Sequence, residues 1–448
     1  MGQRHDRGPG RVSEAELISL VVCDLGAIVR GRAVLASDLE EPLAVGVGWV
    51  PANHALTPLG PLAEPSPFSS VGDLRLMPDP QSRTRVGAEP QDSPLELMLC
   101  DIVELDGRPW PCCPRSFLER ILTALTERAG ATAHASFEHE FQLLGEERPE
   151  LPFSLAAQRA VEPFASELMG ALVEADAEPE RFFAEYASRQ FEVPVGSAPA
   201  ARAADRAVVL REVVREVARR EGRRASFVPL LDPAEAGNGV HVHISLTDAG
   251  GRPLLHDPGR PGELSELGGS FAAGVLAHAP ALCALTAPSP VSAERLRPHR
   301  WSAGAVCLGE RNRETLLRIP PLATLGGASP AAQMRLEYRG ADAAANPHLA
   351  LGAILAAGLD GIAKGLPAPP ILDRDPATLD EQEAQRFGAG GLPATLEDAL
   401  DALEQDPVLR EALGEPLYEA YAALKRAEIA LVVQLPVEER CRRYAEVY

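Results

Sequence analysis

The feature that most constrains the fold is a set of short segments in which apolar and polar residues alternate along the chain. In the segment ASFEHEFQLL, a period of two places Glu138, Glu140 and Gln142 on one face and large apolar residues on the other. This period is typical of a strand with one face in the core of the protein. The segment therefore predicts a sheet whose other face carries acids.

Further segments add histidines, arginines and more acids to the same kind of face. Two of them, GNGVHVHISL and MRLEYRG, alternate with a period of two, and EYASRQFEV lies between them and the first segment. Their polar positions are His241, His243 and Ser245 in GNGVHVHISL, Arg335, Glu337 and Arg339 in MRLEYRG, and Glu185 and Glu192 in EYASRQFEV.

For any one segment, the simplest interpretation is the solvated face of an antiparallel sheet. The four segments together favour another interpretation, because none contains Lys and clustered carboxylates repel one another unless cations neutralise them. Five Glu and one His could hold two divalent ions, and oxygen-rich ligation favours Mg²⁺ or Mn²⁺ over Zn²⁺. The sequence contains no GxxxxGK[ST], GxGxxG, HExxH or GxSxG motif, so metals and arginines would have to hold the phosphates of a bound nucleotide.

The order of the segments predicts an α+β protein of two domains. Short apolar strands broken by Gly- and Pro-rich turns indicate a small β-rich domain over residues 1–110. A helix that ends at Gly130 follows Pro114, so residues 111–448 form a larger domain with an antiparallel sheet. In it we expect helices over 201–221, 347–364 and beyond 396, with a loop over 367–393.

Composition excludes several classes of partner. The net charge of −21 repels nucleic acids and anionic membranes. The N-terminus has no apolar core of a secretory signal, and no segment reaches about 18 uninterrupted apolar residues, so we expect a cytoplasmic protein without a membrane anchor. The seven Cys lack the paired spacing of zinc sites, which predicts free thiols.

The alternating segments together resemble the glutamine synthetase superfamily. The resemblance runs from FEHEF through NGVHVHISL and ERNRETLLRIP to RLEYRGADAAANPHLALGAILAAGLDGI, and it covers nearly all of residues 115–448. The segments SVGDLRLMPDP and CDIVELDGRPW look more loosely like the family's N-terminal β-grasp domain. The resemblance implies a glutamine synthetase fold assembled as a large homo-oligomer of two stacked rings.

The resemblance also implies roles for individual residues. One metal site would consist of Glu140, Glu185 and Glu192, and a second, nearer the phosphates of ATP, of Glu138, His241 and Glu337. The other matched positions are His243 and Ser245 for nucleotide contacts, Arg313 and Arg318 beside the transferring phosphoryl group, and Gly237, Arg295 and Arg339 for glutamate. The implied reaction transfers the γ-phosphoryl group of ATP to the side-chain carboxylate of glutamate, and an amine then attacks the acyl phosphate.

Two departures from the family concern the acceptor. Where glutamine-forming members carry a flap glutamate that binds ammonium, RLRPHRWSAG places Trp301, and the segment GVGWVPANHA stands in place of an aspartate-bearing DGSS motif. An aromatic wall suits the apolar part of an organic amine. The sequence therefore predicts a ligase of the branch that joins glutamate to polyamines, ethanolamine or alkylamines, with Trp301 in the substrate site.

Several alternatives remain open at this point. Trp301 could be a loop aromatic in a locally shifted alignment, the protein could be a true glutamine synthetase that uses ammonium, or it could be a non-catalytic relative. The changes at Phe183, Arg189 and Ala236 leave a glutamate analogue open as the donor acid. The amine and the number of subunits are not determined by the sequence.

Overall fold

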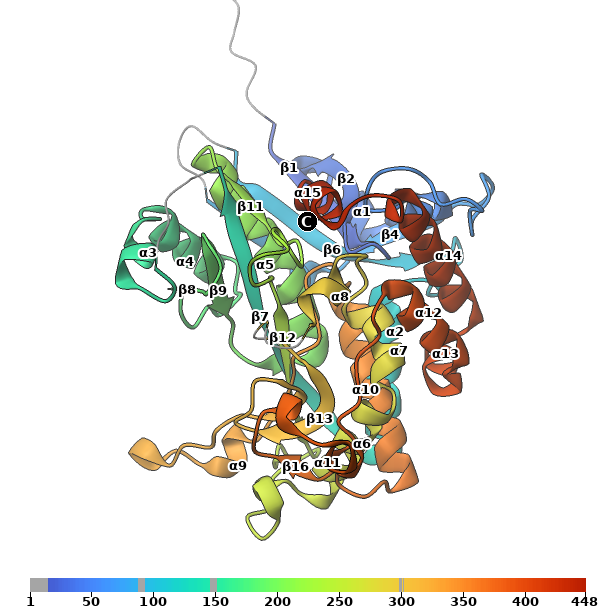
Figure 1. The fold of residues 1–448 in the computed structure, drawn as a ribbon. Coiled ribbons are helices and arrows are strands. Elements are labelled where there is room, and N and C mark those ends of the chain that lie inside the picture. The colour runs from blue at the N-terminus through green and yellow to red at the C-terminus, as the bar shows by residue number, and fades with distance from the viewer. Residues whose placement is uncertain (1–14, 88–92, 146–150, 298–299, 301) are drawn as a thin grey trace, which may run out of the picture.

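The computed structural model describes residues 15–87, 93–145, 151–297, 300 and 302–448. Its N-terminal part is a sheet of six strands in the order β2-β1-β6-β4-β3, with β5 beside β6 (Figure 1). Strands β1 and β6 are parallel and the other pairs are antiparallel. The strands are β1 (Leu17–Cys23), β2 (Val29–Leu35), β3 (Val47–Trp49), β4 (Leu74–Pro78), β5 (Thr84–Val86) and β6 (Leu95–Val103), and the helix α1 (Glu40–Val45) precedes β3.

The larger part of the molecule is built on a second sheet, of ten strands. Its order is β16-β13-β14-β15-β12-β7-β9-β8, and both β10 and β11 pair with β7. The pairs from β14 to β8 are antiparallel as expected, whereas β13 runs parallel to β14 and β16. The strands are β7 (Thr132–Leu144), β8 (Phe183–Ala184), β9 (Gln190–Pro194), β10 (Ala198–Pro199), β11 (Arg224–Ser226), β12 (Val240–Thr247), β13 (Ala305–Glu310), β14 (Thr315–Ile319), β15 (Leu336–Tyr338) and β16 (Ile371–Leu372).

Three long helices lie on the apolar side of this sheet (Figure 1). The helix α2 (Pro114–Ala129) ends at Gly130 in the left-handed conformation, as predicted. Helix α5 (Ala200–Arg220) and helix α10 (Pro347–Lys364) also match the predicted ranges. The Asn346 side chain caps α10 by accepting hydrogen bonds from the first backbone amides of the helix.

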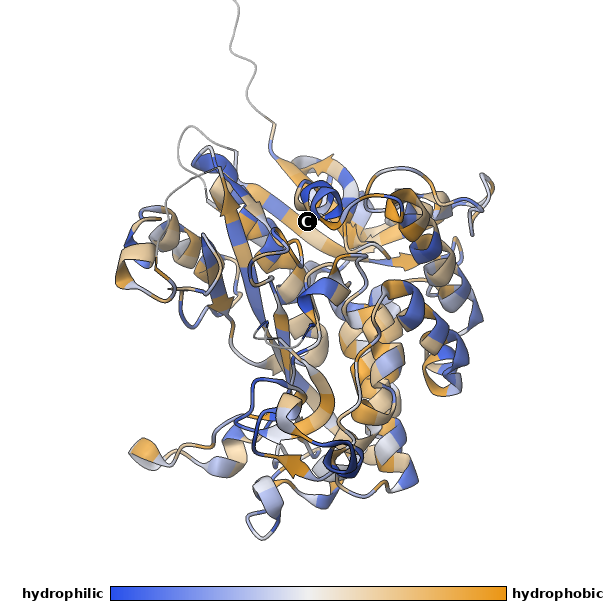
Figure 2. Cartoon of the chain, in the orientation of Figure 1, coloured by the Kyte–Doolittle hydropathy of each residue, from blue (hydrophilic) through white to orange (hydrophobic). Residues whose placement is uncertain are grey.

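Helix α10 crosses α6 (Glu266–Ala277) at very short range. A Cβ atom at Gly274 would lie 2.2 Å from the carbonyl oxygen of Ala357, and one at Gly361 would lie 2.1 Å from that of Ser270. Because real Cβ atoms do not approach backbone so closely, glycine is required at both positions of the crossing. Figure 2 shows α10 as largely hydrophobic, in keeping with its central place.

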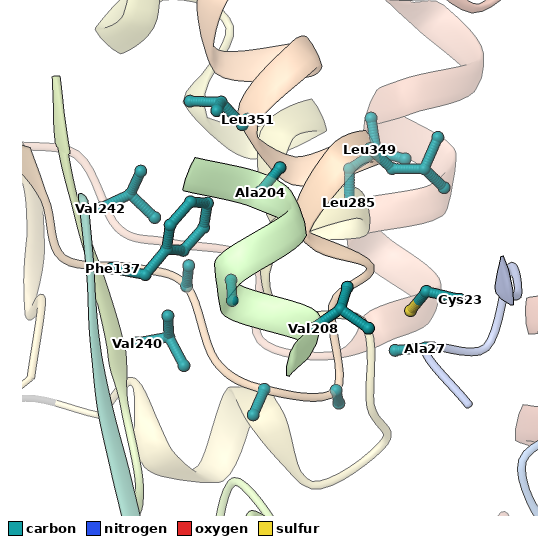
Figure 3. Close-up of a cluster of buried hydrophobic side chains, with 14 of the residues drawn as sticks. Cys23, Ala27, Phe137, Ala204, Val208, Val240, Val242, Leu285, Leu349 and Leu351 are labelled. Atoms are coloured by element: carbon teal, nitrogen blue, oxygen red, sulfur yellow. The ribbon is translucent and has the colours of Figure 1, made fainter. Parts of the chain in front are cut away.

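The alternation of β7 and β12 separates the core from the polar face. Phe137 on β7 and Val240 and Val242 on β12 point toward helix α5, where Ala204 and Val208 meet them (Figure 3). Leu285, Leu349 and Leu351 extend the cluster, and Cys23 and Ala27 join it from the N-terminal sheet. The acids of the same strands therefore lie on the opposite face of the sheet.

A partly buried ionic network joins the N-terminal sheet to the helices. The Arg115 guanidinium lies 2.9 Å from Asp79, 3.1 Å from Asp101 and 2.9 Å from Asp205 on α5. Asp205 also contacts the His348 ring at 2.8 Å. Burial alone would raise the pKa of Asp205, but the neighbouring His348 and Arg115 lower it. One arginine thus ties three parts of the fold together.

The remaining helices include one that the sequence analysis missed. The predicted loop over 367–393 contains α11 (Glu381–Phe387), which begins at a capping box formed by Asp380 and Glu383. The helices predicted beyond residue 396 are confirmed. The other helices are α3 (Leu155–Arg159), α4 (Phe164–Glu174), α7 (Ala279–Thr286), α8 (Ser292–Arg295), α9 (Pro330–Gln333), α12 (Leu396–Gln405), α13 (Pro407–Leu413), α14 (Glu415–Val432) and α15 (Val437–Ala445).

Two expectations about the chain as a whole can be compared with this structure. All seven cysteines are buried free thiols, as predicted. Among the described residues no single helix is long and apolar enough to cross a membrane, and only the bent pair α6 and α7, at 75°, passes the length and composition test together. The predicted α+β class, with a small N-terminal sheet domain and a large domain built on a second sheet, is confirmed.

Candidate active site

The register of the central strands brings the polar positions together. Glu138 on β7 lies directly opposite His241 on β12, and His243 on β12 lies opposite Glu337 on β15. Glu337 in turn lies opposite Arg318 on β14. Side chains directly opposite one another on one face of a sheet are close enough to interact. Four neighbouring strands thus concentrate acids, imidazoles and an arginine on one face.

Among the described residues, Glu138, His243 and Glu337 form a compact group of candidate metal ligands, whose ligand atoms all lie within 4.8 Å of one another. The two Glu138 oxygens lie 3.2 Å from His241 Nδ1 and 3.1 Å from His243 Nε2. The predicted set contained His241 and not His243. In the structure both rings face Glu138, and His243 belongs to the compact group.

The second predicted set, Glu140, Glu185 and Glu192, lies at the adjoining edge of the sheet. Glu140 is directly opposite Glu192 on β9, and Glu185 follows β8, so the segment EYASRQFEV lies in a short hairpin. Burial, with Glu140 nearby, raises the pKa of Glu185 to about 7. Burial, with Glu138 and Glu140 nearby, raises the pKa of Glu192 to about 11. Such crowding is what a divalent cation bound by carboxylate oxygens would offset.

Two arginines pair with the carboxylate of Glu337. Arg318 donates to Glu337 at 2.6 Å, and Arg339 donates to its other oxygen. Although burial alone would raise it, the charges of Arg339, His243, His241 and Arg318 lower the pKa of Glu337 to about 2. Glu337 is therefore held as a carboxylate beside a concentration of positive charge.

One cavity of about 490 Å³ connects most of these side chains. All six predicted metal ligands line it, as do His243, Gly237, Arg313, Arg318 and Arg339. Ser245 and Arg295 are not among its described lining residues. Trp301 lies outside the described residues.

The position of Arg295 is unexpected for a direct contact with substrate. Its side chain is only 2 % exposed and donates to the carbonyl oxygen of Ala341 at 2.6 Å. A Cβ atom at Gly237 would lie 2.7 Å from its Cγ, so glycine leaves the room that the Arg295 side chain occupies beneath the cavity wall. In this conformation Arg295 supports the wall from behind.

Sequence reasoning gave no role to two residues that the structure places in the site. Arg335 lines the cavity and donates from Nε to His243 Nδ1 at 3.0 Å; its place beside Glu337 in the alternating segment was the available signal. The buried Gln190 amide lies 3.1 Å from Glu140 Oε2 and 2.9 Å from the carbonyl oxygen of Gly237. Gln190 thereby links the acidic edge to the loop that was predicted to bind glutamate.

The segment GVGWVPANHA belongs to an aromatic cluster of the N-terminal sheet. His54 accepts a hydrogen bond from Trp49 at 3.0 Å, and its ring lies 5.2 Å from that of Trp110. Burial lowers the pKa of His54 to about 3, so the ring is neutral. No acidic residue occurs in this segment.

Family models match the chain over nearly its whole length. The glutamine synthetase N-terminal domain matches residues 7–110, and the glutamine synthetase catalytic domain matches residues 111–444. The chain belongs to the glutamine synthetase family. Enzymes of this family are ATP-dependent ligases that use a divalent metal, and the predicted class of carbon–nitrogen ligase is confirmed at that level.

The chain is similar to relatives that are named for different activities within the family. A gamma-glutamylpolyamine synthetase, GlnA3 of Streptomyces coelicolor, is 36 % identical over 451 residues, which cover 95 % of this chain and 94 % of the relative. A glutamine synthetase of Methanocaldococcus jannaschii is 33 % identical over 373 residues, covering 80 % and 79 %. A crystal structure described as a novel glutamine synthase homolog has 49 % identity and a TM-score of 0.90, covering 98 % of this chain and 100 % of that one.

The residues of the site fit the metal and nucleotide that the family uses. Carboxylate oxygens dominate the donor set, which suits Mg²⁺ or Mn²⁺. Arg313, Arg318 and Arg335 line the same cavity and can neutralise phosphate oxygens. The chemistry of the described side chains therefore agrees with the family assignment.

Proposed function

We propose that this protein activates the side-chain carboxylate of glutamate with ATP and joins it to an organic amine, giving a γ-glutamyl amide. The observation that carries the proposal is the convergence of five Glu, two His and several Arg on one cavity. A polyphosphate and a developing acyl phosphate both need this combination of metal ligands and fixed positive charge.

The proposed reaction has two steps. An oxygen of the glutamate side-chain carboxylate forms a bond to the γ-phosphorus of ATP, and the bond to ADP breaks. The amine nitrogen then bonds to the acyl carbon, the C–O bond to the phosphoryl group breaks so that inorganic phosphate leaves with its electron pair, and the nitrogen releases a proton. Divalent ions bound by the two glutamate sets would supply charge neutralisation for both phosphate groups.

Different residues of the cavity would contact the phosphoryl group, the nucleotide and the donor acid. Arg313 and Arg318 would stabilise the charge that spreads over the transferring phosphoryl group. His243 and Ser245 would contact the nucleotide, and Gly237 and Arg339 would contact the donor acid. Arg295, held beneath Gly237, would reach the donor only through a small rearrangement of that wall.

The choice of an organic amine rests on the sequence and on the relatives. Trp301 and the acid-free segment GVGWVPANHA replace the two anionic groups that bind ammonium in glutamine-forming members. The relative that matches over 95 % of this chain is named a gamma-glutamylpolyamine synthetase. Ordinary glutamine synthesis is the second candidate, because relatives named glutamine synthetase also match over 80 % of the chain.

Phosphate release measured with ATP, Mg²⁺, glutamate and a panel of amines tests this proposal. We expect an organic amine to support faster release than ammonium, with the γ-glutamyl amide identified by mass spectrometry. Release with ammonium alone would favour the second candidate, and no release with any amine would favour a non-catalytic relative. Light scattering of the purified protein would test the proposed large assembly of stacked rings.

A further inference from the structure

The wall of the cavity next to Glu185 is aromatic. Phe153 and Phe183 line the cavity together with Glu185, and Tyr186 follows Glu185 directly in the chain. The rings of Phe153 and Tyr186 lie 6.5 Å apart and are tilted by 51°. Phe153, Phe183 and Tyr186 are called the aromatic rim below.

The conformation and exposure of Phe153 indicate that its ring is not placed by packing in the hydrophobic core. Phe153 has a φ of +58°, which bulky residues rarely adopt because of steric strain. Its side chain is 51 % exposed and that of Tyr186 is 49 % exposed, so neither ring fills the core. Ser154 begins α3 immediately afterwards and fixes the direction of the chain. A strained backbone that presents a large apolar ring to a substrate cavity is a recurring mark of a binding site.

The charges around the cavity restrict what can lie against this rim. Every carboxylate among the described lining residues belongs to the five glutamates of the two predicted metal sets. Arg181 and Arg300 also line the cavity, and the acid nearest Arg181 in the chain, Glu180, pairs with it at 3.1 Å. Among the described lining residues, a second ammonium group on the acceptor would therefore meet arginines and no carboxylate outside the two metal sets. An apolar or aromatic group would meet rings of its own kind.

We infer that the aromatic rim receives the non-reacting part of the acceptor, and that the acceptor is a monoamine with an aromatic or similarly bulky apolar group. This inference rests on the proposed function and names the class of amine. It differs from what the name of the polyamine-using relative would suggest. The reacting nitrogen would lie toward Glu185, and the hydrocarbon would lie between Phe153 and Phe183.

Steady-state kinetics with three amines test the inference on the full-length protein with ATP, Mg²⁺ and glutamate. Benzylamine represents an aromatic monoamine, putrescine represents a polyamine, and ammonium represents the family's common acceptor. We expect kcat/KM for benzylamine to exceed that for putrescine by about tenfold or more, as one aromatic contact can provide. Higher kcat/KM for putrescine would overturn the inference while leaving the proposed function intact. Turnover with ammonium alone would overturn both.

Variants of the rim separate binding from folding. Phe153→Gly removes the ring at a backbone position that favours glycine, so the protein should fold normally by circular dichroism. We expect the KM for benzylamine to rise by about tenfold while the KM values for ATP and glutamate stay unchanged. Leu155→Ala, which truncates a side chain that is 71 % exposed and outside the described cavity lining, is the matched control and should change none of them. Equal effects of Phe153→Gly on benzylamine and ammonium would refute a role in acceptor specificity.

Discussion

Glu140 on β7 lies directly opposite Glu192 on β9, in register, on the polar face of the central sheet. Glu192 is only 6 % exposed, so this pair of acids is held together where water screens it poorly. Such a pair is destabilising unless a proton or a cation compensates it. The arrangement is therefore understandable as a binding site and not as a device for stability.

Replacing one acid of this pair should separate stability from function. In the absence of divalent metal, Glu192→Gln should raise Tm near neutral pH, because the raised pKa makes Glu192 take up a proton on folding, whereas Gln is already uncharged. Each 1 kcal/mol gained corresponds to a Tm change of about 2 °C or less in a chain of this size. The variant should lose Mg²⁺-dependent phosphate release, and Mg²⁺ should raise its Tm less than that of the wild type. Equal stabilisation of both proteins by Mg²⁺ in differential scanning fluorimetry would argue against Glu192 as a ligand.

Arg318 should act mainly on the chemical step. Its guanidinium lines the cavity and is positioned by Glu337 at 2.6 Å. Arg318→Ala should lower kcat by about 10² or more if this charge stabilises the transferring phosphoryl group. Arg318→Lys, which keeps the charge, serves as the comparison and should recover part of the loss. A change confined to the KM for glutamate would assign Arg318 to donor binding.

His278 should make stability depend on pH. Its ring lies 2.6 Å from Asp406 and 3.1 Å from Asp360, and Lys364 also pairs with Asp360 at 2.8 Å. The hydrogen bond to Asp406 is the main reason that the pKa of His278 is raised above its ordinary 6.5, with Asp360 adding to it. The stabilisation is fully present below pH 6.5 and is lost as the pH rises through the higher pKa of the folded state.

The matched variant His278→Gln tests this contribution, since Gln cannot gain a charge. Wild type should exceed His278→Gln in Tm at pH 6, and the difference should shrink by pH 9. Both proteins would be scanned in the same buffers and at the same salt concentration. A difference in Tm that does not change with pH would show that the ring contributes by packing alone.

Arg115 should be important for holding the N-terminal sheet against helices α2 and α5. It is 15 % exposed and contacts Asp79, Asp101 and Asp205, so Arg115→Ala would leave the nearly buried Asp205 without its guanidinium partner. Removing one partner of such a network costs about 3 kcal/mol or more. Arg108→Ala, which breaks an exposed pair with Asp106, is the control and should cost less than about 1 kcal/mol. Equal midpoints of the two variants in urea unfolding would contradict this account.

The sequence was informative where structure depends on local periodicity. Alternation alone placed Glu138 and Glu140 on one face of β7 and Phe137 in the core, and Gly130 marked the end of α2. Helix α11, which the sequence did not predict, has a local signal in Asp380 and Glu383, which form a capping box within a segment rich in Pro and Gly.

Features that depend on distant segments could not be predicted in this way. His243 lies in one ligand group with Glu138 and Glu337 because β12 pairs with β15 in a particular register, which alternation within one strand does not specify. Phe153 lines the cavity beside α3, which packs near β8, and its positive φ leaves no trace in its residue type. The turn between β8 and β9 likewise uses Arg189 at a φ of +56°, where glycine would have been the expected signal.

Competition between two acceptors tests the central claim most directly. Purified protein would receive ATP, Mg²⁺ and glutamate with equal concentrations of ammonium and an apolar primary amine such as benzylamine, and mass spectrometry would quantify both products. Against an aromatic wall, burial of each methylene of an organic amine contributes about 0.8 kcal/mol, a gain that ammonium cannot have because it carries no carbon. We predict that the γ-glutamyl amide of the organic amine predominates, and that Trp301→Ala shifts the product ratio toward glutamine. Predominance of glutamine with the wild-type protein would contradict the account and support glutamine synthesis as the function.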